Sequence, residues 1–252
     1  MRLANIFVMA VMMTAFSTQA QGLKIYMSNG TVSEYRAADV EKIVFLDDSE
    51  MPDGVQAVDL GLSVKWASCN LGATDPQEYG DFYAWAETSP KETYSWATYK
   101  YAQGDVHTLT KYNNDEDYGM VDNINKLEDA DDAAMQNLGP DWHIPTRAEW
   151  EELEQNCVWT WDDAAKGYKV TGRNGNSIFL PANGIYNDEK YGYGYAGEYG
   201  YYMSSDLNTT YWYYEDCYAF YGPDDELDAD HYPFYVLRCI GIGVRPVKAV
   251  QE

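Results

Sequence analysis

The stretch WHIPTRAEWEELEQNC, residues 142–157, carries the clearest local signal in the chain. Thr146 and Glu149 have the spacing of a capping box, in which the threonine hydroxyl accepts from an unpaired backbone N–H and the glutamate reaches back to the cap. Trp150, Leu153 and Cys157 follow at i, i+3 and i+7, so they share one face of a helix. The stretch therefore predicts an amphipathic helix that begins after Thr146 and packs against a core.

Strand-like segments surround this helix. Residues 62–69 (LSVKWASC) and 81–87 (DFYAWAE) precede it and are rich in aromatic and β-branched residues. A second helix is predicted in LEDADDAAMQNLG, residues 127–139, whose final glycine stands where a helix can end. Short segments separated by Gly, Asn or Asp follow: VWTW, GYKVTG, NSIFLPA, YYMSS, TYWYY, CYAFY and FYVLRCIGIGVRPV. Two helices followed by antiparallel strands indicate an α+β domain.

Two parts of this domain are predicted to lie outside its central strands. Residues 100–127 are polar and rich in Tyr, Asn and Asp, with little periodicity, which is typical of an ordered insertion loop. The last strand carries Gly241, Gly243 and Pro246. Because glycine weakens a strand and proline cannot donate to a ladder, these residues argue against the end of that strand being central.

Residues 1–20 have the pattern of a signal peptide. Arg2 precedes an apolar run, Ile6 to Phe16, and Thr18-Gln19-Ala20 is a small-residue cleavage site. The apolar run is shorter than the ~20 residues that a membrane-spanning helix needs. We therefore expect no membrane insertion, and we expect an exported protein, secreted or located in the periplasm or at the cell surface. Gln21 follows the cleavage site where a lipid-anchored protein would have Cys.

The rest of the chain is expected to form two parts joined by a linker. Residues 21–48 read as a small β unit, because two short runs flank Asn29-Gly30, a strong hairpin signal, and a third run, KIVF, follows. Such a unit is too small to be stable alone. Residues 49–54 are acidic with Pro and Gly and predict the linker. The main domain then covers residues 55–248.

The composition excludes several classes of partner. Hydrophobic residues make up 46% of the chain, which excludes wholesale disorder. The formal charge is −24 and becomes −25 when Arg2, the one charged residue of the signal segment, is removed. Nucleic acid is thereby disfavoured as a partner, because its binding depends on neutralising phosphates with Lys and Arg. Direct binding to anionic membrane surfaces is disfavoured for the same reason.

The chain contains four cysteines, Cys69, Cys157, Cys217 and Cys239. Cysteines of exported proteins usually form disulfides, and four of them allow three connectivities. Their spacing does not resemble a zinc site, since no C-x-x-C occurs and no histidine stands nearby at ligand spacing. The residues alone leave the pairing open.

An ordered set of motifs resembles the Fibrobacter succinogenes major paralogous domain, a family of exported proteins common in gut Bacteroidetes. The motifs are SVKWASCNLGA, EYGDFYAWAETSP, DWHIPTRAEWEEL, GYKVTGRNGNSIFLPANG and the terminal GVRPV, and the resemblance covers roughly residues 55–248. It implies a fold similar to C-type lectin-like domains and to the formylglycine-generating enzyme, with two helices, a twisted antiparallel sheet and long loops. Residues 202–205 depart from the family, because YMSS stands where WSS is usual and Met203 replaces a large aromatic residue. The segment 23–45 also looks like a short unit often attached to such proteins.

The resemblance also implies one disulfide. Members with a cysteine at the position of Cys69 often have one at the position of Cys157, so a Cys69–Cys157 bond is expected, and Cys217 would then pair with Cys239 across neighbouring strands. The formylglycine-generating relatives rely on a reactive cysteine pair. Here Cys217 and Cys239 lie in Tyr-rich strand sequence, which suits a structural bond better.

A catalytic constellation is not evident in the sequence. A hydrolytic triad needs a base beside its nucleophile, but His143 stands in the turn before a helix, and His107 and His231 lie in polar loops. Neither G-x-S-x-G nor H-E-x-x-H occurs. The 41 acidic residues carry no information on a glycosidase pair, because some pair falls at any separation. The chain is therefore expected not to be an enzyme.

Calcium is the metal that the acidic segments favour. Two segments concentrate oxygen ligands of the kind that calcium requires: LEDADD, residues 127–132, and GPDDELDAD, residues 222–230. Neither matches the spaced D-x-[DN]-x-[DN]-G loop, and solvated acidic loops explain them better. No metal ligand is assigned, and no cofactor is expected apart from this calcium alternative.

Tyrosine is concentrated near the C-terminal end, where residues 186–235 hold 14 of the 24 tyrosines. Tyrosine suits contact surfaces because it combines a rigid face with a hydroxyl, whereas alternate positions of a strand must face the core. Trp212, Tyr218 and Phe220 are predicted to be core residues. The predicted ligand-binding residues are Tyr191, Tyr193, Tyr195, Tyr199, Tyr213 and Tyr221.

Three functional hypotheses follow from these patterns. The first is an exported, non-enzymatic binding or adhesion module that presents its Tyr-rich loops to a glycan or a protein. The second is a target of a diversity-generating retroelement, because Tyr, Asn, Asp and Ser are codon neighbours under adenine replacement. The third is an enzyme that acts on glycans or resembles the formylglycine-generating enzyme. The oligomeric state and the ligand stay open.

Overall fold

The computed structural model describes residues 22–26, 32–36, 55–186, 193–208, 214–222 and 232–250. The chain divides into two units, Met1–Asp47 and Asp48–Glu252. In the first unit, β1 (Gly22–Tyr26) and β2 (Val32–Arg36) pair antiparallel with Tyr26 opposite Val32. The two strands around Asn29-Gly30 are thus confirmed, while the signal segment and the KIVF run lie outside the described residues. Among the described residues, no helix is both long enough and apolar enough to cross a membrane.

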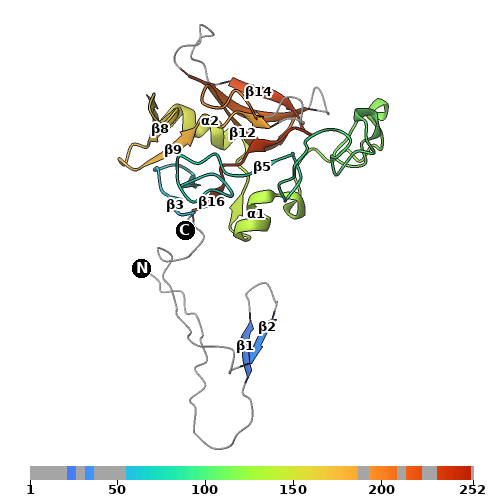
Figure 1. Ribbon diagram of the computed structural model, residues 1–252, viewed down its shortest axis with the longest axis horizontal. Coiled ribbons are helices and arrows are strands. Elements are labelled where there is room, and N and C mark those ends of the chain that lie inside the picture. Colours follow the sequence, from blue (N-terminus) through green and yellow to red (C-terminus); the bar gives the residue numbers. More distant parts are fainter. Residues whose placement is uncertain are drawn as a thin grey trace, which may run out of the picture. The chain divides into compact units, whose positions relative to one another are not determined.

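In its described residues, the second unit contains three larger sheets, one two-stranded pair and two α-helices (Figure 1). The largest sheet has the strand order β14-β13-β12-β15-β5. All its pairs are antiparallel except β12 with β15, which is parallel. Its strands are β5 (Phe82–Tyr83), β12 (Tyr199–Leu207), β13 (Tyr214–Tyr221), β14 (Tyr232–Leu237) and β15 (Ile242–Gly243).

Two smaller antiparallel sheets complete this framework. The four-stranded sheet has the order β3-β4-β16-β6 and consists of β3 (Ala57–Val58), β4 (Val64–Ala67), β6 (Trp142–His143) and β16 (Val247–Ala249). The three-stranded sheet consists of β7 (Val158–Asp162), β8 (Gly167–Thr171) and β9 (Ser177–Pro181). The short strands β10 (Ile185–Tyr186) and β11 (Tyr193–Gly194) form a separate pair. The α+β class with antiparallel strands is therefore confirmed.

Helix α2 (Arg147–Asn156) begins as its sequence predicts. The Thr146 hydroxyl accepts from the backbone N–H of Glu149, and the Glu149 carboxylate accepts from the backbone N–H of Thr146 at 2.7 Å. Trp150 is buried and stacks on Tyr218 with ring centroids 4.7 Å apart. The helix therefore lies against β12 and β13, as Figure 1 shows.

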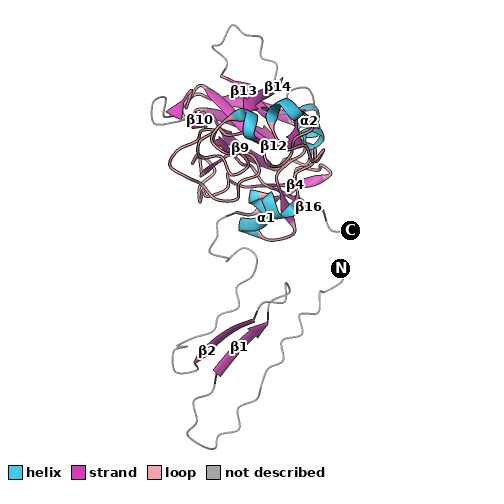
Figure 2. Cartoon of the chain, turned by 90° about the vertical axis from the view of Figure 1, so that its right-hand side faces the viewer, coloured by secondary structure: helices cyan, strands magenta, loops and turns pink. Residues whose placement is uncertain are grey.

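Helix α1 (Ala133–Leu138) also forms where it is predicted. The 3₁₀ helix Asp129–Asp131 leads into it, the Asp132 side chain caps it by accepting from the Met135 N–H, and Gly139 ends it. Figure 2 shows α1 beside β16, at the end of the unit opposite to β13 and β14, with much loop between them. The two helices thus cover different parts of the core.

A buried arginine joins the two smaller sheets. Arg245 is fully buried and donates to the carbonyls of Ala67 in β4 and Phe179 in β9, at 2.9 and 2.7 Å. It also donates to the Asn70 amide oxygen at 2.9 Å. A buried cation is tolerated only when its donors are hydrogen-bonded. Because these bonds reach both β4 and β9, Arg245 couples the two smaller sheets.

The C-terminal segment corrects one prediction. β15 lies between β12 and β5, and β16 lies between β4 and β6, so both are central strands. Pro246 stands just before β16, and the carbonyl that it contributes accepts from the Ala67 N–H at 2.9 Å. Gly243 is required for close packing, because a Cβ there would collide with the Asn183 amide. The glycine and the proline therefore mark tight packing inside the sheets rather than an edge.

The segment DFYAWAE, predicted as a strand over residues 81–87, is a strand only at Phe82–Tyr83. The chain turns after it, and Ala86 has φ +63°. The cause is Trp85, which is buried and donates from its indole N–H to the Ser204 carbonyl at 3.0 Å. Anchoring this large side chain across β12 takes the backbone out of the ladder.

The insertion over residues 100–127 is ordered, as predicted. It contains two 3₁₀ helices, Val106–Thr108 and Glu116–Tyr118, which are linked by hydrogen bonds between the backbones of Leu109 and Tyr118 (2.8 Å). The predicted core residues Tyr218 and Phe220 are 4% and 0% exposed, which confirms them, and Trp212 lies outside the described residues. Met203 is also buried, so the departure from the family motif is a core position.

Candidate binding surface

The glycine- and tyrosine-rich segment is held in place over its described part, residues 193–199. β11 pairs antiparallel with β10, so that Gly194 lies opposite Ile185. The Gly184 N–H donates to the Tyr199 carbonyl at 2.8 Å, and the Gly197 N–H donates to the Ala182 carbonyl at 2.7 Å. These bonds run from both ends of the segment to residues 182–185. This part of the sequence therefore forms a defined surface rather than a loose loop.

Tyr195 occupies the turn of this segment in an unfavourable conformation. Its φ of +66° is in the left-handed region, which costs a residue with a Cβ roughly 1–2 kcal/mol. The turn is closed by the Tyr195 carbonyl, which accepts from the N–H groups of Glu198 (3.0 Å) and Tyr199 (2.9 Å). The side chain of Tyr195 is 52% exposed. Tyr195 is thus a strained and exposed aromatic residue, and backbone outliers of this kind concentrate at functional sites.

Three tyrosines from two segments meet beside this turn and are called here the tyrosine cluster: Tyr195, Tyr199 and Tyr221. The rings of Tyr195 and Tyr199 have centroids 5.1 Å apart, and those of Tyr199 and Tyr221 are 4.9 Å apart at an interplanar angle of 87°. Tyr199 and Tyr221 are half-buried, and they are register partners on β12 and β13. The ladder thus presents the cluster as one aromatic surface.

Tyr201 lies behind the cluster and belongs to the core. It is 7% exposed, with its ring centroid 6.4 Å from that of Tyr199. The pKa of Tyr201 is raised above its usual range, mainly by burial and to a smaller extent by neighbouring groups that include tyrosine hydroxyls. This phenol therefore stays neutral and serves as the apolar support of the surface.

Trp161 in β7 lies near the end of β13 but outside the tyrosine cluster. A Cβ placed on Gly222 would lie 3.4 Å from two ring atoms of Trp161, and the Tyr168 hydroxyl donates to the Tyr221 carbonyl at 3.2 Å. The β7–β8 hairpin therefore reaches the end of β13. Because successive side chains of a strand point to opposite faces, Trp161 lies on the face of Phe220, with which Tyr168 also packs, and not on the face of the Tyr221 ring.

The other predicted binding residues are placed only in part. Tyr191 and Tyr213 lie outside the described residues. Tyr193 is described by its backbone in β11, opposite Tyr186. The structure thus brings together three of the predicted positions, Tyr195, Tyr199 and Tyr221, on a single surface.

All four cysteines lie within the described ranges, and the structure holds each of them as a thiol. Cys69, Cys217 and Cys239 are buried and Cys157 is half-buried. Burial raises the pKa of Cys69 and of Cys157. The ladder places Phe234 opposite Cys217, whereas Cys239 comes after the end of β14, so the register does not support a cross-strand pair of Cys217 and Cys239. The Cys69–Cys157 bond stays a prediction.

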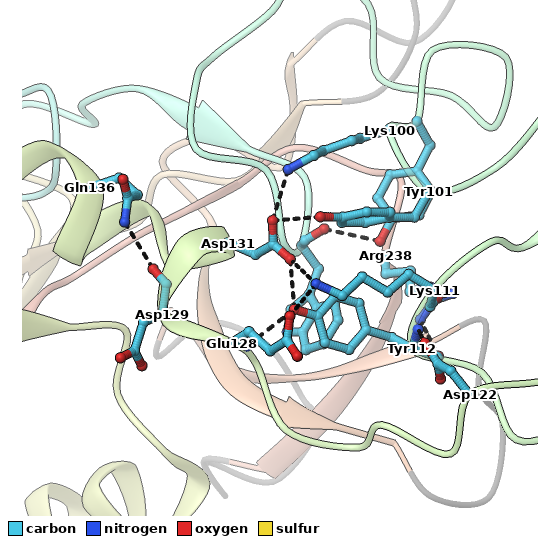
Figure 3. A network of polar contacts seen from close by, with 12 residues as sticks. Lys100, Tyr101, Lys111, Tyr112, Asp122, Glu128, Asp129, Asp131, Gln136 and Arg238 are labelled. Atoms are coloured by element: carbon cyan, nitrogen blue, oxygen red, sulfur yellow. Dashed lines mark hydrogen bonds and ion pairs between the residues drawn. The ribbon is translucent and has the colours of Figure 1, made fainter.

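A group of charged and tyrosine side chains surrounds Asp131 (Figure 3). Its carboxylate is 2% exposed and accepts from the ammonium groups of Lys100 and Lys111, each at 2.7 Å. The hydroxyls of Tyr101 and Tyr112 also donate to it. Burial alone would raise the pKa of Asp131, but these donors hold it well below the usual range. A carboxylate so fully bonded is a structural anchor and a poor general base.

The Asp131 network ties the insertion to the main sheet. Arg238, at the end of β14, is fully buried and donates to the Tyr112 carbonyl at 2.8 Å, with its guanidinium over the ring of Tyr99. Asp131 meets Tyr112 from the opposite side, through the phenol hydroxyl. These contacts fix the start and the middle of the insertion relative to the core.

This network also shows what the segment LEDADD, residues 127–132, does. Asp131 is bonded to two ammonium groups, and Asp132 caps α1 and accepts from the Ile144 N–H at 2.9 Å. Both carboxylates therefore have roles in the fold, and this segment is not proposed as a calcium site. The second acidic segment lies outside the described residues from 223 onward.

The described histidines have structural surroundings. His143 Nε2 lies 3.0 Å from Glu149 Oε1, which also belongs to the capping box of α2. Burial lowers the pKa of His143, but the Glu149 carboxylate outweighs it, so the pKa is raised overall. His107 is exposed and stacks on Tyr118 with ring centroids 5.1 Å apart. His231 lies outside the described residues.

Comparison of the chain with protein-family models, with curated proteins and with solved structures finds no match. The resemblance to the Fibrobacter succinogenes major paralogous domain therefore stays a prediction that rests on its motifs. Any functional argument has to come from the geometry of the chain itself.

Proposed function

We propose that this chain is a non-enzymatic binding module that contacts a protein partner through the tyrosine cluster. The observation that carries the proposal is Tyr195. Its ring is 52% exposed, its backbone is held at φ +66°, and it packs on Tyr199 rather than extending into solvent. A strained, exposed and positioned aromatic side chain is what a contact surface requires.

The extent of the surface favours a protein over a glycan at this place. The rings come from two separate parts of the chain, the turn at Tyr195 and the β12–β13 ladder. Tyr and Trp are the residues most enriched at the centre of protein–protein interfaces, where a few aromatic anchors contribute most of the affinity. Exposed Glu198 and Lys166 lie at the rim, as polar residues do in such interfaces.

The charge of the chain specifies the partner further. A formal charge of −24 produces a negative field that repels acidic surfaces and steers basic ones. Complementary charge mainly speeds association, and its effect falls as salt screens it. The proposed partner therefore has a basic rim around an apolar patch, and its association is faster at low ionic strength.

The proposal includes the finer fold and the location. The lectin-like fold rests on the motif set of residues 55–248, and it is compatible with two helices, antiparallel sheets and long ordered loops. Export rests on the signal pattern of residues 1–20. Together they make an extracellular or periplasmic adhesion role the one that we favour.

The test uses two single variants with matched chemistry. Tyr195→Ala removes the exposed ring of the cluster, and Tyr235→Ala removes a tyrosine that is 48% exposed on β14, opposite Asp216 and away from Tyr221. Parent and variant proteins are immobilised and exposed to host mucosal and bacterial surface extracts. A partner that the parent and Tyr235→Ala retain and Tyr195→Ala loses supports the proposal.

Two outcomes would count against it. Equal retention of every partner by Tyr195→Ala and the parent would show that the cluster is not the contact surface. The same proteins on a glycan array decide the ligand class, because a glycan signal that Tyr195→Ala abolishes would make the cluster a sugar platform instead.

A further inference from the structure

A groove of about 460 Å³ lies on the outer face of the three-stranded sheet, away from the tyrosine cluster residues. Its floor consists of outward-facing residues of β8 and β9, with Lys169 opposite Phe179 and Thr171 opposite Ser177 in the ladder. Its wall is the turn that contains Asp75 and Gln77, and Asp162 at the end of β7 lies at its margin. The volume is in the range of small-ligand sites.

The wall of the groove is held rigidly. Glu78 Oε2 accepts from the backbone N–H groups of Thr74 (2.8 Å) and Asp75 (3.1 Å), and Asp75 Oδ1 accepts from the Gln77 N–H at 2.9 Å. The backbone bonds lower the pKa of Glu78, so this brace is present at neutral pH. A turn closed in this way has little freedom to lose when a ligand binds.

The floor is held as firmly. The Arg245 guanidinium donates to the Phe179 carbonyl at 2.7 Å from the core side. The Phe179 ring lies across Gly167, where an added Cβ would be 2.6 Å from ring atom Cζ. Glycine at this position therefore lets the ring lie close to the sheet. The half-buried ring forms a fixed apolar patch among polar groups.

The polar groups of the groove retain hydrogen-bonding capacity. Asp162 Oδ1 accepts from the N–H groups of Ala164 and Ala165, both at 3.0 Å. Asp75 also accepts through Oδ1, from the Gln77 N–H. In the described part of the chain, the Lys169 ammonium forms neither a salt bridge nor a hydrogen bond. The site thus offers acceptor-only carboxylate oxygens, a donor-only ammonium, and the Gln77 amide and Ser177 hydroxyl, which do both.

The ligand group that satisfies such a mixture is the hydroxyl. An amine can only donate to the carboxylates, and a carboxylate can only accept from Lys169, whereas hydroxyls around one ring do both. Hydrogen bonds from hydroxyls to charged groups are also stronger than neutral ones. A sugar ring combines these hydroxyls with a C–H face that fits the ring of Phe179. The −24 charge of the chain disfavours acidic sugars.

We propose that the groove between the Asp75–Gln77 turn and the outer face of β7–β9 is a binding site for a neutral saccharide. Phe179 supports the sugar ring, Lys169 donates to its oxygens, and Asp75 and Asp162 accept from its hydroxyls. The site is separate from the tyrosine cluster, so the protein bears two surfaces for two classes of ligand.

The test is an array that presents neutral hexose oligosaccharides beside uronic-acid and sialylated oligosaccharides. The parent protein is expected to bind neutral members in preference to acidic ones. Lys169→Ala is expected to lower the affinity for them about tenfold, which corresponds to the loss of one charge-assisted hydrogen bond. Phe179→Leu, which keeps an apolar cover on Gly167, is expected to have an effect of similar size.

Two controls separate this result from other causes. Lys126→Ala removes an exposed lysine far from the groove lining, and Tyr195→Ala alters the tyrosine cluster alone; both are expected to bind the saccharide as the parent does. Silence on every neutral saccharide, or equal binding by Lys169→Ala and the parent, overturns the proposal. Because Lys169 is exposed, its replacement does not threaten folding. Loss of binding in Tyr195→Ala instead would assign the saccharide to the tyrosine cluster.

Discussion

The ring of Tyr199 packs edge-on against the ring of Tyr221, with centroids 4.9 Å apart and planes at 87°. The two residues are register partners on β12 and β13, so their contact stabilises the sheet as well as shaping its surface. Tyr195 stands outside this ladder and is 52% exposed. Replacement of Tyr195 is therefore the variant that separates binding from stability.

The strain at Tyr195 leads to a first prediction about stability. At φ +66°, alanine keeps the cost of a Cβ in the left-handed region, whereas glycine does not. Tyr195→Gly is therefore expected to be about 1 kcal/mol more stable than Tyr195→Ala, although both lack the ring. Denaturant unfolding of the two variants measures the difference. Equal stabilities would show that the turn is not strained.

A second prediction concerns Tyr199, which is half-buried in the cluster. Tyr199→Ala removes its edge-to-face contacts with Tyr195 and Tyr221 and part of its buried area. We expect a loss of about 2 kcal/mol in the free energy of unfolding, of which the aromatic pairing contributes about 1 kcal/mol. Tyr235→Ala, at an exposed position of similar chemistry, is the matched control and is expected to change stability by about 0.5 kcal/mol or less.

The Asp131 network gives a third prediction. Asp131→Asn leaves the ammonium groups of Lys100 and Lys111 beside a neutral amide in a buried place. Because Asp131 is buried while the side chains of Lys100 and Lys111 are 46% and 22% exposed, we expect a loss of about 2 kcal/mol, between the values for exposed and fully buried pairs. Urea unfolding at pH 7 measures this loss. A loss below about 1 kcal/mol would show that the network does not hold the insertion to the core.

The same network makes stability depend on acid. The pKa of Asp131 is lowered in the folded protein, so the unfolded chain takes up a proton first. The stabilisation is complete above the unfolded pKa of about 4 and is lost as pH falls through the folded value. The parent should therefore lose stability below about pH 4 more steeply than Asp131→Asn. Parallel acid unfolding curves would contradict this assignment.

A fourth prediction concerns the His143–Glu149 pair at the start of α2. The pKa of His143 is raised and that of Glu149 is lowered in the folded protein. The histidine contribution is complete below its unfolded pKa of about 6.5 and is lost as pH rises through the higher folded value. The glutamate contribution is complete above about pH 4.3 and is lost in acid. The pair therefore stabilises most between these values.

Thermal unfolding at pH 5.5 and at pH 8.5 tests this window. The parent should be more stable at the lower pH by a margin that His143→Gln reduces. Thr146→Ala, which removes the cap without touching the histidine, should cost about 1 kcal/mol at both values. A margin unchanged in His143→Gln would place the pH dependence elsewhere in the chain.

The cysteines supply a fifth prediction. In the reduced protein, burial raises the pKa of Cys69, which is 1% exposed, and also that of half-buried Cys157. A thiol-specific reagent at pH 7 should therefore label Cys69 slowly until denaturant is added, because the thiolate is the reacting form. Peptide mapping of the oxidised protein tests the expected Cys69–Cys157 bond. Finding only other pairs, or only thiols, would contradict it.

The sequence is most informative where the signals are local. The capping box at Thr146 and the apolar face at Trp150 predict α2 closely. The cap residue stands directly before the helix, and the apolar face lies inside its ten residues, so both signals are local. The hairpin strands β7, β8 and β9 follow in the same way from alternating residues and the turns between them. Local propensity and tertiary packing agree in these elements.

Long-range pairings were beyond such reasoning. The central position of β16 depends on β4 and β6, which come from distant parts of the chain. The partners of Asp131 are 19 to 31 residues away, and no periodic pattern links them. At the candidate surface, composition singled out Tyr195, Tyr199 and Tyr221, but their packing beside the buried ring of Tyr201 is visible only in the folded sheet.

The proposed binding surface is tested most directly by photo-crosslinking from Tyr195, a residue of the tyrosine cluster. Tyr195 and, in a second protein, Tyr235 are replaced by p-benzoylphenylalanine, and each protein is irradiated with the extracts used for partner capture. We expect a discrete protein adduct from position 195 and none from position 235. An adduct from position 235 alone, or none from position 195 while the partner is still captured, would show that the tyrosine cluster is not the binding surface.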